Sequence, residues 1–146
     1  MSFRFATLTF MSKASLTTGT TLGVLAVLHV TWAMGSSFPF QSRAELADAV
    51  VGRNTVPPPR ASFSVASLLA IGAGLVLNLL SIPRGFRNGA LTIMAAVLLL
   101  RSAAGFSANT SRLSKGSDSE RFRRLDRRLY SPLCLLLAIG SLCVRN

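Results

Sequence analysis

Seven side chains in this 146-residue sequence are candidates to bind a ligand or move a proton. An imidazole can act as a general acid or base near neutral pH, and a guanidinium with a nearby carboxylate can hold an anionic or hydroxyl group. Aromatic rings with a polar edge, such as tryptophan and tyrosine, suit a membrane interface. The candidate ligand-binding or polar cluster consists of His29, Trp32, Arg101, Asp126, Arg128, Tyr130 and Ser131. Whether they meet depends on the elements that carry them.

Composition indicates a membrane protein. Half of the residues are hydrophobic and 14% are charged, and the mean hydropathy is +0.49, which is too apolar for an ordinary soluble domain. We predict an all-α polytopic membrane protein, a four-transmembrane-helix bundle with short interfacial helices in its first and third loops. The expected spans are 16–36, 61–82, 88–107 and 129–145 within one membrane domain, 16–146, and residues 1–15 form an interfacial or disordered segment.

The first loop contains a predicted short helix. Ser42 and Glu45 have the spacing of a capping box, and Gly52 suits the position after a helix end. Three prolines, 57–59, then prevent the helix from continuing. The segment could be a lid over a site, but a structural connector is the interpretation that we favour.

Small residues predict where helices pack closely. Gly19 and Gly23 lie four apart in the first span, and Ala66, Ala70 and Gly74 form a smooth face on the second. Asn78 is expected to cap a helix or to make a polar contact between helices. A tight turn is predicted at residues 83–87, which would make the second and third spans a hairpin.

A basic amphipathic helix is predicted at about 118–129, opened by a capping box of Ser117 and Glu120. At 100° per residue, Phe122, Leu125 and Leu129 form one apolar stripe. The opposite face is arginine-rich and should meet anionic lipid headgroups through Arg121, Arg123, Arg124 and Arg127, with Arg128 beside them.

Asp126 falls on the apolar side of that helix, so its carboxylate needs a cation or a donor. Arg101 is the candidate partner, because an arginine inside a span either pairs or extends toward the interface. The first and third spans end, and the fourth begins, on one side of the bilayer, so the candidate residues should lie at a similar depth. They form either a site or an ion-paired contact that fixes helix order, and we favour the contact.

The fourth span is short. Ser131 and Pro132 suit an N-cap and first helical position, and residues 132–145 extend only about 21 Å. Either the helix enters from Asp126 with its arginine side chains reaching the interface, or the bilayer is thin there. If the helix is continuous, Pro132 bends it.

Metal, cofactor and nucleic-acid functions are not expected. Cys134 and Cys143 stand nine residues apart, about 13 Å along a helix, too far for a disulfide. With one histidine in the chain, no metal-ligand set is visible. The net charge of +11 is better explained by headgroups than by nucleic acid, since no nucleic-acid-binding motif accompanies it.

Three motifs carry a family resemblance: His-Val-Thr-Trp-Ala-Met-Gly at 29–35, Leu-Leu-Arg-Ser at 99–102, and Leu-Asp-Arg-Arg-Leu-Tyr-Ser-Pro-Leu-Cys-Leu at 125–135. Together they resemble a family of small bacterial four-helix membrane proteins known only as a domain of unknown function. The resemblance implies the fold and a residue cluster but no activity. It also implies an acid where this chain has Gly105, which leaves Asp126 as the partner expected for Arg101.

Charge counts favour one orientation in a cell membrane. The side with the two long loops holds ten Lys or Arg against five on the side with the termini and the short turn. The positive-inside rule then places the long loops in the cytoplasm and both termini outside.

Three functional classes fit the sequence. The first, which the sequence favours, is an accessory or interaction protein that binds a membrane protein or a second copy of itself. The second is a binding module for a lipid, quinone or other amphiphile near His29 and Arg101. The third is a membrane enzyme using His29, which ranks last because no positioned partner or nucleophile is visible, so no catalytic residue is assigned.

Overall fold

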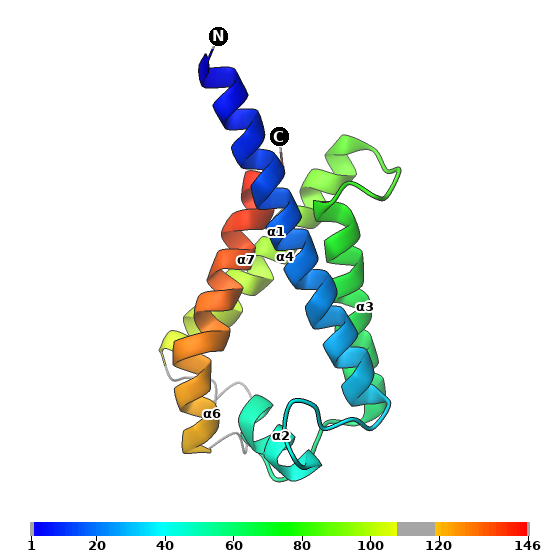
Figure 1. Cartoon of the computed structure of the whole chain (residues 1–146), viewed down its shortest axis with the longest axis vertical. Helices are drawn as coiled ribbons and strands as arrows, with labels where there is room; N and C mark the ends of the chain where they lie inside the picture. Colours follow the sequence, from blue (N-terminus) through cyan, green and yellow to red (C-terminus); the bar gives the residue numbers. More distant parts are fainter. Residues whose placement is uncertain (1, 108–118, 146) are drawn as a thin grey trace.

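The computed structural model describes residues 2–107 and 119–145 of the chain, with side chains from residue 13 onward (Figure 1). Within these residues the regular structure is entirely helical and contains no strand. The helices are α1 (Ser2–Ala33), α2 (Arg43–Val50), α3 (Pro59–Val76), α4 (Arg84–Phe106), α6 (Glu120–Leu125) and α7 (Ser131–Cys143). A π-helical turn, η1 (Asp126–Tyr130), joins α6 to α7. The predicted all-α class is confirmed.

Three helices are long and apolar enough to cross a membrane: the Lys13–Ala33 part of α1, then α3 and α4. They correspond to the first three predicted spans and suggest a membrane location. Helix α1 also extends back to Ser2, through the segment predicted to be interfacial or disordered. That segment contains neither proline nor glycine, so nothing in its sequence interrupts a helix.

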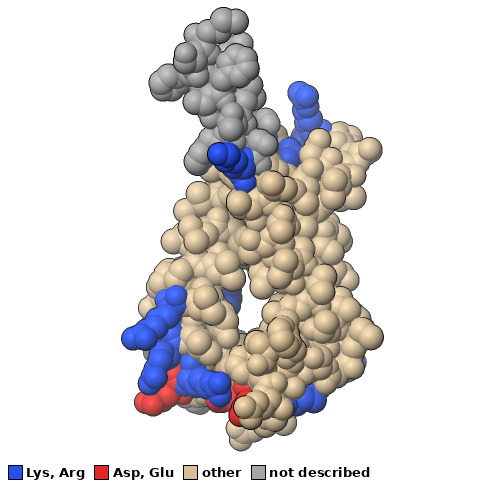
Figure 2. Space-filling view, viewed as in Figure 1, with Lys and Arg blue, Asp and Glu red and all other residues tan. Residues whose placement is uncertain are grey.

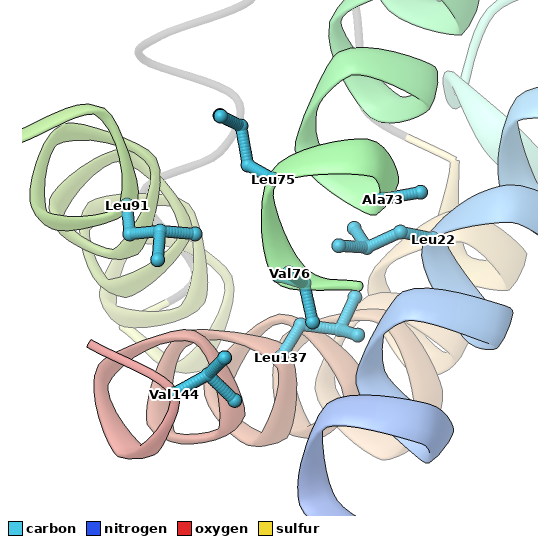
Figure 3. Packing of buried hydrophobic residues seen from close by; sticks show 7 residues of the cluster. All are labelled: Leu22, Ala73, Leu75, Val76, Leu91, Leu137 and Val144. Atoms are coloured by element: carbon cyan, nitrogen blue, oxygen red, sulfur yellow. The ribbon is translucent and has the colours of Figure 1, made fainter. Parts of the chain in front are cut away.

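The long helices form two pairs, α1 with α3 and α4 with α7. The pairs meet where α1 contacts α7 and separate toward α2, so the ribbon resembles an inverted V (Figure 1). Where the pairs meet, all four helices contribute to one apolar core (Figure 3). Its buried members are Leu22, Ala73, Leu75, Val76, Leu91, Leu137 and Val144.

Helix α3 ends earlier than predicted because Asn78 adopts a left-handed conformation, φ 56°. The Asn78 N–H donates to the Leu75 carbonyl and the Leu79 N–H to the Gly74 carbonyl, which is the Schellman pattern of a helix end. Of the two roles expected of Asn78, the structure shows the one at a helix end, through its backbone conformation. The predicted tight turn at 83–87 is wrong, since Pro83, with extended backbone angles (φ −57°, ψ 140°), is the N-cap of α4 and Arg84 already belongs to that helix.

Arg87 joins the ends of two helices. Its Nε donates to the Leu75 carbonyl at 2.8 Å and its Nη1 to the Val144 carbonyl at 3.3 Å, so one cation satisfies carbonyls at the ends of α3 and α7. Ser15 of α1 donates to the Val76 carbonyl beside them at 2.7 Å.

We expect Arg87→Met to lower the free energy of unfolding by about 1–2 kcal/mol, because two charge-assisted hydrogen bonds to carbonyls are lost at a half-buried site. Arg84→Met removes the same charge from an exposed position one turn away and is the matched control. Detergent unfolding curves of the two variants check this, and equal losses would contradict the role of Arg87.

The predicted small-residue face of α3 is only partly correct. Ala66 is buried, but Ala70 is exposed, and the buried side is continued by Ala73 and Val76. Steps of four residues drift around an α-helix, whereas alternating steps of three and four keep to one stripe. In α1, a side chain at Gly19 would meet Leu77, in agreement with the predicted close packing, but one at Gly23 would meet no atom within 4 Å, so the prediction is wrong for Gly23.

The first loop follows the prediction closely. Ser42 is the N-cap of α2, and its side chain accepts from the Glu45 N–H at 3.2 Å. Gly52 follows the helix with φ 71°, and a side chain there would meet the Phe122 ring of α6 at 3.0 Å. Helix α2 therefore lies across the open end of the V, against α6. The predicted capping residue Ser117 lies outside the described residues; the N-cap of α6 is Ser119, which accepts from the Phe122 N–H.

Charge divides the surface into zones. On the face shown in Figure 2, Lys and Arg gather at the two ends, and most of the band between them is uncharged. An opening between the helix pairs is visible above α2 in the same view. Large apolar side chains such as Leu68, Ile93 and Leu136 are 66–69% exposed on the long helices, as expected for surfaces that face lipid.

Candidate functional site

Arg101 and Asp126 form the ion pair that the sequence predicts. Arg101 Nη2 donates to Asp126 Oδ1 at 2.7 Å, linking α4 to η1. Asp126 is 1% exposed, whereas 35% of the Arg101 side chain is accessible. Burying the Asp126 carboxylate removes it from water, and the ion pair with Arg101 offsets that desolvation cost.

The π-helical turn explains how Asp126 faces α4. The Ser131 N–H bonds to the Asp126 carbonyl, and the Ser131 hydroxyl donates to Asp126 Oδ1 at 3.3 Å. In a regular α-helix, residues five apart point about 140° away from each other, and the wider π turn brings them to one side. Pro132 lacks an N–H and crowds the carbonyl four residues earlier, so a wider turn just before it relieves both problems.

The helix consequently continues from α6 through η1 into α7. The prediction that Ser131 is an N-cap is wrong, because Ser131 has helical backbone angles, φ −67° and ψ −46°. Its side chain binds Asp126 instead of a free N–H. The continuous alternative for the last helix is the one that the structure adopts.

Helix α4 approaches this point very closely. The Ser102 hydroxyl donates to the Ser131 carbonyl at 2.8 Å, and both side chains are buried. A Cβ at Gly105 would overlap Ser131 Oγ and lie 2.9 Å from Asp126 Oδ1. We call Arg101, Ser102, Gly105, Asp126 and Ser131 the α4–α7 polar contact. Sequence analysis did not assign Ser102 or Gly105 to it, although Gly105 stands where the resemblance implies an acid.

His29 and Trp32 lie in a different place, beside a cavity of about 180 Å³. The cavity is bounded by α1, α2, the start of α3 and the loop before it, and most of its lining is apolar. The residues around it are His29, Trp32, Leu46, Ala47, Val50, Val51, Val56, Pro57, Ala61, Ser62 and Val65. We call it the His29 cavity.

The two rings of the His29 cavity are held by backbone carbonyls. His29 Nδ1 lies 2.7 Å from the Leu25 carbonyl oxygen, and Trp32 Nε1 donates to the Phe38 carbonyl at 2.7 Å. The ring centroids are 4.8 Å apart and tilted by 56°. Because a carbonyl can only accept, Nδ1 carries the proton, and in the neutral imidazole Nε2 is then the accepting nitrogen.

The remaining candidates, Tyr130 and Arg128, differ from both groups. The Tyr130 hydroxyl donates to the Ala49 carbonyl at 3.1 Å and so ties η1 to α2. Arg128 is exposed among other arginines of α6 and η1. The structure therefore joins Arg101, Asp126 and Ser131, and separates them from the cavity beside His29 and Trp32.

The described part of the chain shows neither a metal-ligand group nor a disulfide. It contains no group of three or more His, Cys, Asp or Glu side chains that could hold a metal ion. Cys134 and Cys143 are free thiols, as their spacing predicts.

The motifs of the polar contact and of the His29 cavity fall within one family match. The family described as "Protein of unknown function (DUF3995)" matches residues 22–141. The chain belongs to this family. No curated protein and no solved structure matches it. The DUF3995 match includes His29, Arg101 and Asp126, and it assigns no activity to them.

Proposed function

We propose that this DUF3995 protein is a multi-pass membrane protein that binds a hydroxyl-bearing amphiphile in the His29 cavity. The observation that carries the proposal is the cavity itself, with an apolar lining and one titratable side chain. Its volume of about 180 Å³ suits one ring or a short stretch of alkyl chain, since an apolar cavity of about 150 Å³ can hold benzene. A few polar groups in an apolar pocket are typical of small-molecule sites.

The chemistry of His29 narrows the ligand class. With Nδ1 bonded to the Leu25 carbonyl, the neutral ring offers an acceptor at Nε2. A ligand with an O–H donor, such as a hydroquinone or a long-chain alcohol, complements that acceptor. An oxidised quinone carries only acceptors and complements it less well.

We also infer that the chain crosses the membrane four times, with the His29 cavity near one membrane surface. We infer that α6, η1 and α7 together provide the fourth crossing, since Glu120–Cys143 covers about 36 Å at about 1.5 Å per residue. The inferred orientation has the long loops, and so the end of the molecule with α2, on the cytoplasmic side of the cell membrane, because ten Lys and Arg lie in or next to those loops, five of them in the α6 and η1 part of the fourth crossing.

An accessory role, with a membrane protein partner or a second copy, is the function that the sequence alone favours. The exposed apolar side chains of α3 and α4 would serve lipid and protein neighbours equally well. The cavity favours a small ligand specifically, and ligand binding is therefore our first choice.

Trp32 offers a direct test, because it is the only tryptophan of the chain and lines the cavity. We expect a short-tailed one-ring hydroquinone to change Trp32 fluorescence saturably in detergent micelles. Ala61→Phe should abolish the saturable change by filling the cavity, and Ala70→Phe, at an exposed position on the same helix and outside the cavity lining, should preserve it. A response that is linear in ligand, or equal in both variants, would refute the proposal.

A further inference from the structure

A second hollow lies beside α6, away from the His29 cavity. It is a shallow groove of about 610 Å³ lined by side chains of α6, η1 and the first loop. They are Phe40, Glu120, Arg121, Arg124, Leu125, Leu129 and Tyr130. We call this the α6 groove.

The α6 groove changes character along the helix. Arg121 and Arg124 lie on α6 and are exposed, whereas Leu125 and Leu129 follow toward α7. Leu129 is 54% exposed although it is a large apolar side chain. From Arg121 to Leu129 the helix advances about 12 Å at about 1.5 Å per residue. Cationic groups thus lie at the outer end of the groove and apolar groups at the end that leads into α7.

One of the cations is held in place. The Arg121 guanidinium lies 5.4 Å from the centre of the Phe40 ring, within the range of a cation–π contact. Arg124 faces the same groove, and Glu120 supplies the one carboxylate. Two guanidinium groups against one carboxylate leave the groove cationic. A guanidinium can donate two parallel hydrogen bonds to two oxygens of one phosphate. A phosphate group is therefore the anion that best complements Arg121 and Arg124.

We propose that the α6 groove binds one anionic phospholipid, with its phosphate at Arg121 and Arg124 and an acyl chain along Leu125 and Leu129. The apolar half of the groove distinguishes such a lipid from a soluble phosphate, which has nothing to place against Leu129. The neighbouring hollow lined by Glu120, Arg123, Arg124, Arg127 and Arg128 has no apolar residue, so it attracts an anionic surface without selecting one molecule. This proposal is independent of the His29 cavity.

Lipid retention after extraction tests the groove. The full-length protein is reconstituted into nanodiscs of phosphatidylglycerol and phosphatidylcholine in equal amounts, extracted into mild detergent and examined by native mass spectrometry. We expect one phosphatidylglycerol to remain bound to the wild type. Arg121→Gln with Arg124→Gln should weaken its retention about 10- to 30-fold, from about 1 kcal/mol for each arginine near the headgroup.

A matched pair of substitutions separates the groove from general attraction. Arg123→Gln with Arg127→Gln removes the same charge from residues outside the groove and should retain the lipid. Leu129→Asn should also lose the lipid, whereas a site for headgroup phosphate alone would be indifferent to it. Equal loss in both double variants, retention in Leu129→Asn, or displacement of the lipid by millimolar inorganic phosphate would each overturn the proposal. Circular dichroism of each variant verifies that the helices remain.

Discussion

Asp126→Asn is expected to lower the free energy of unfolding by about 2–3 kcal/mol. The amide keeps an oxygen for the Ser131 hydroxyl but loses the charge that holds Arg101 Nη2 at 2.7 Å. Breaking a fully buried ion pair costs about 3–5 kcal/mol, and the 35% exposure of the Arg101 side chain reduces that figure here. Unfolding of the purified protein by SDS in mixed micelles, followed by circular dichroism, measures the loss.

Arg123→Ala is the control for Asp126→Asn, because Arg123 is also charged but is exposed on α6 and lies outside the α6 groove. It should change stability by less than about 0.5 kcal/mol. A double-mutant cycle of Asp126→Asn with Arg101→Met isolates the pair, and a coupling of about 1–2 kcal/mol is expected for groups in contact. Additive losses would mean that Asp126 stabilises the fold without help from Arg101.

The ion pair could be predicted because its two members break a strong pattern. Arg101 interrupts an apolar span and Asp126 falls within the apolar stripe of a basic helix, and each charge needs the other. Local signals were equally informative at α2, where Ser42 and Gly52 begin and end the helix as expected. Such features depend on a few neighbouring residues or on one dominant electrostatic requirement.

Other features depend on how helices approach each other, and the sequence did not reveal them. The wheel for Phe122–Leu129 assumed regular α-helix, whereas the π turn shifts the register so that Asp126 and Ser131 share a side. Similar depth also does not imply contact. The pairs α1–α3 and α4–α7 separate toward α2, and this places His29 in a cavity of its own instead of beside Arg101.

Gly105→Ala should destabilise the protein by about 3 kcal/mol, the upper end of the usual cost of inserting a group into a packed interior. The new Cβ would overlap Ser131 Oγ and lie 2.9 and 3.0 Å from the two carboxylate oxygens of Asp126. None of these atoms can move easily, because Ser131 and Asp126 are buried and bonded to each other. Helix α4 would have to withdraw, which would also lengthen the Ser102 bond to α7.

Gly89→Ala is the matched control, since Gly89 belongs to the same helix and a Cβ there meets no atom within 4 Å. Without a clash, replacing a helical glycine by alanine should leave stability equal or raise it by about 0.5–1 kcal/mol. SDS unfolding measures the stability of both variants. If Gly105→Ala is as stable as Gly89→Ala, then α4 and α7 can move apart at this point without a loss of stability. A larger loss for Gly105→Ala would show that the glycine lets α7 come close enough to α4 for Asp126 to reach Arg101.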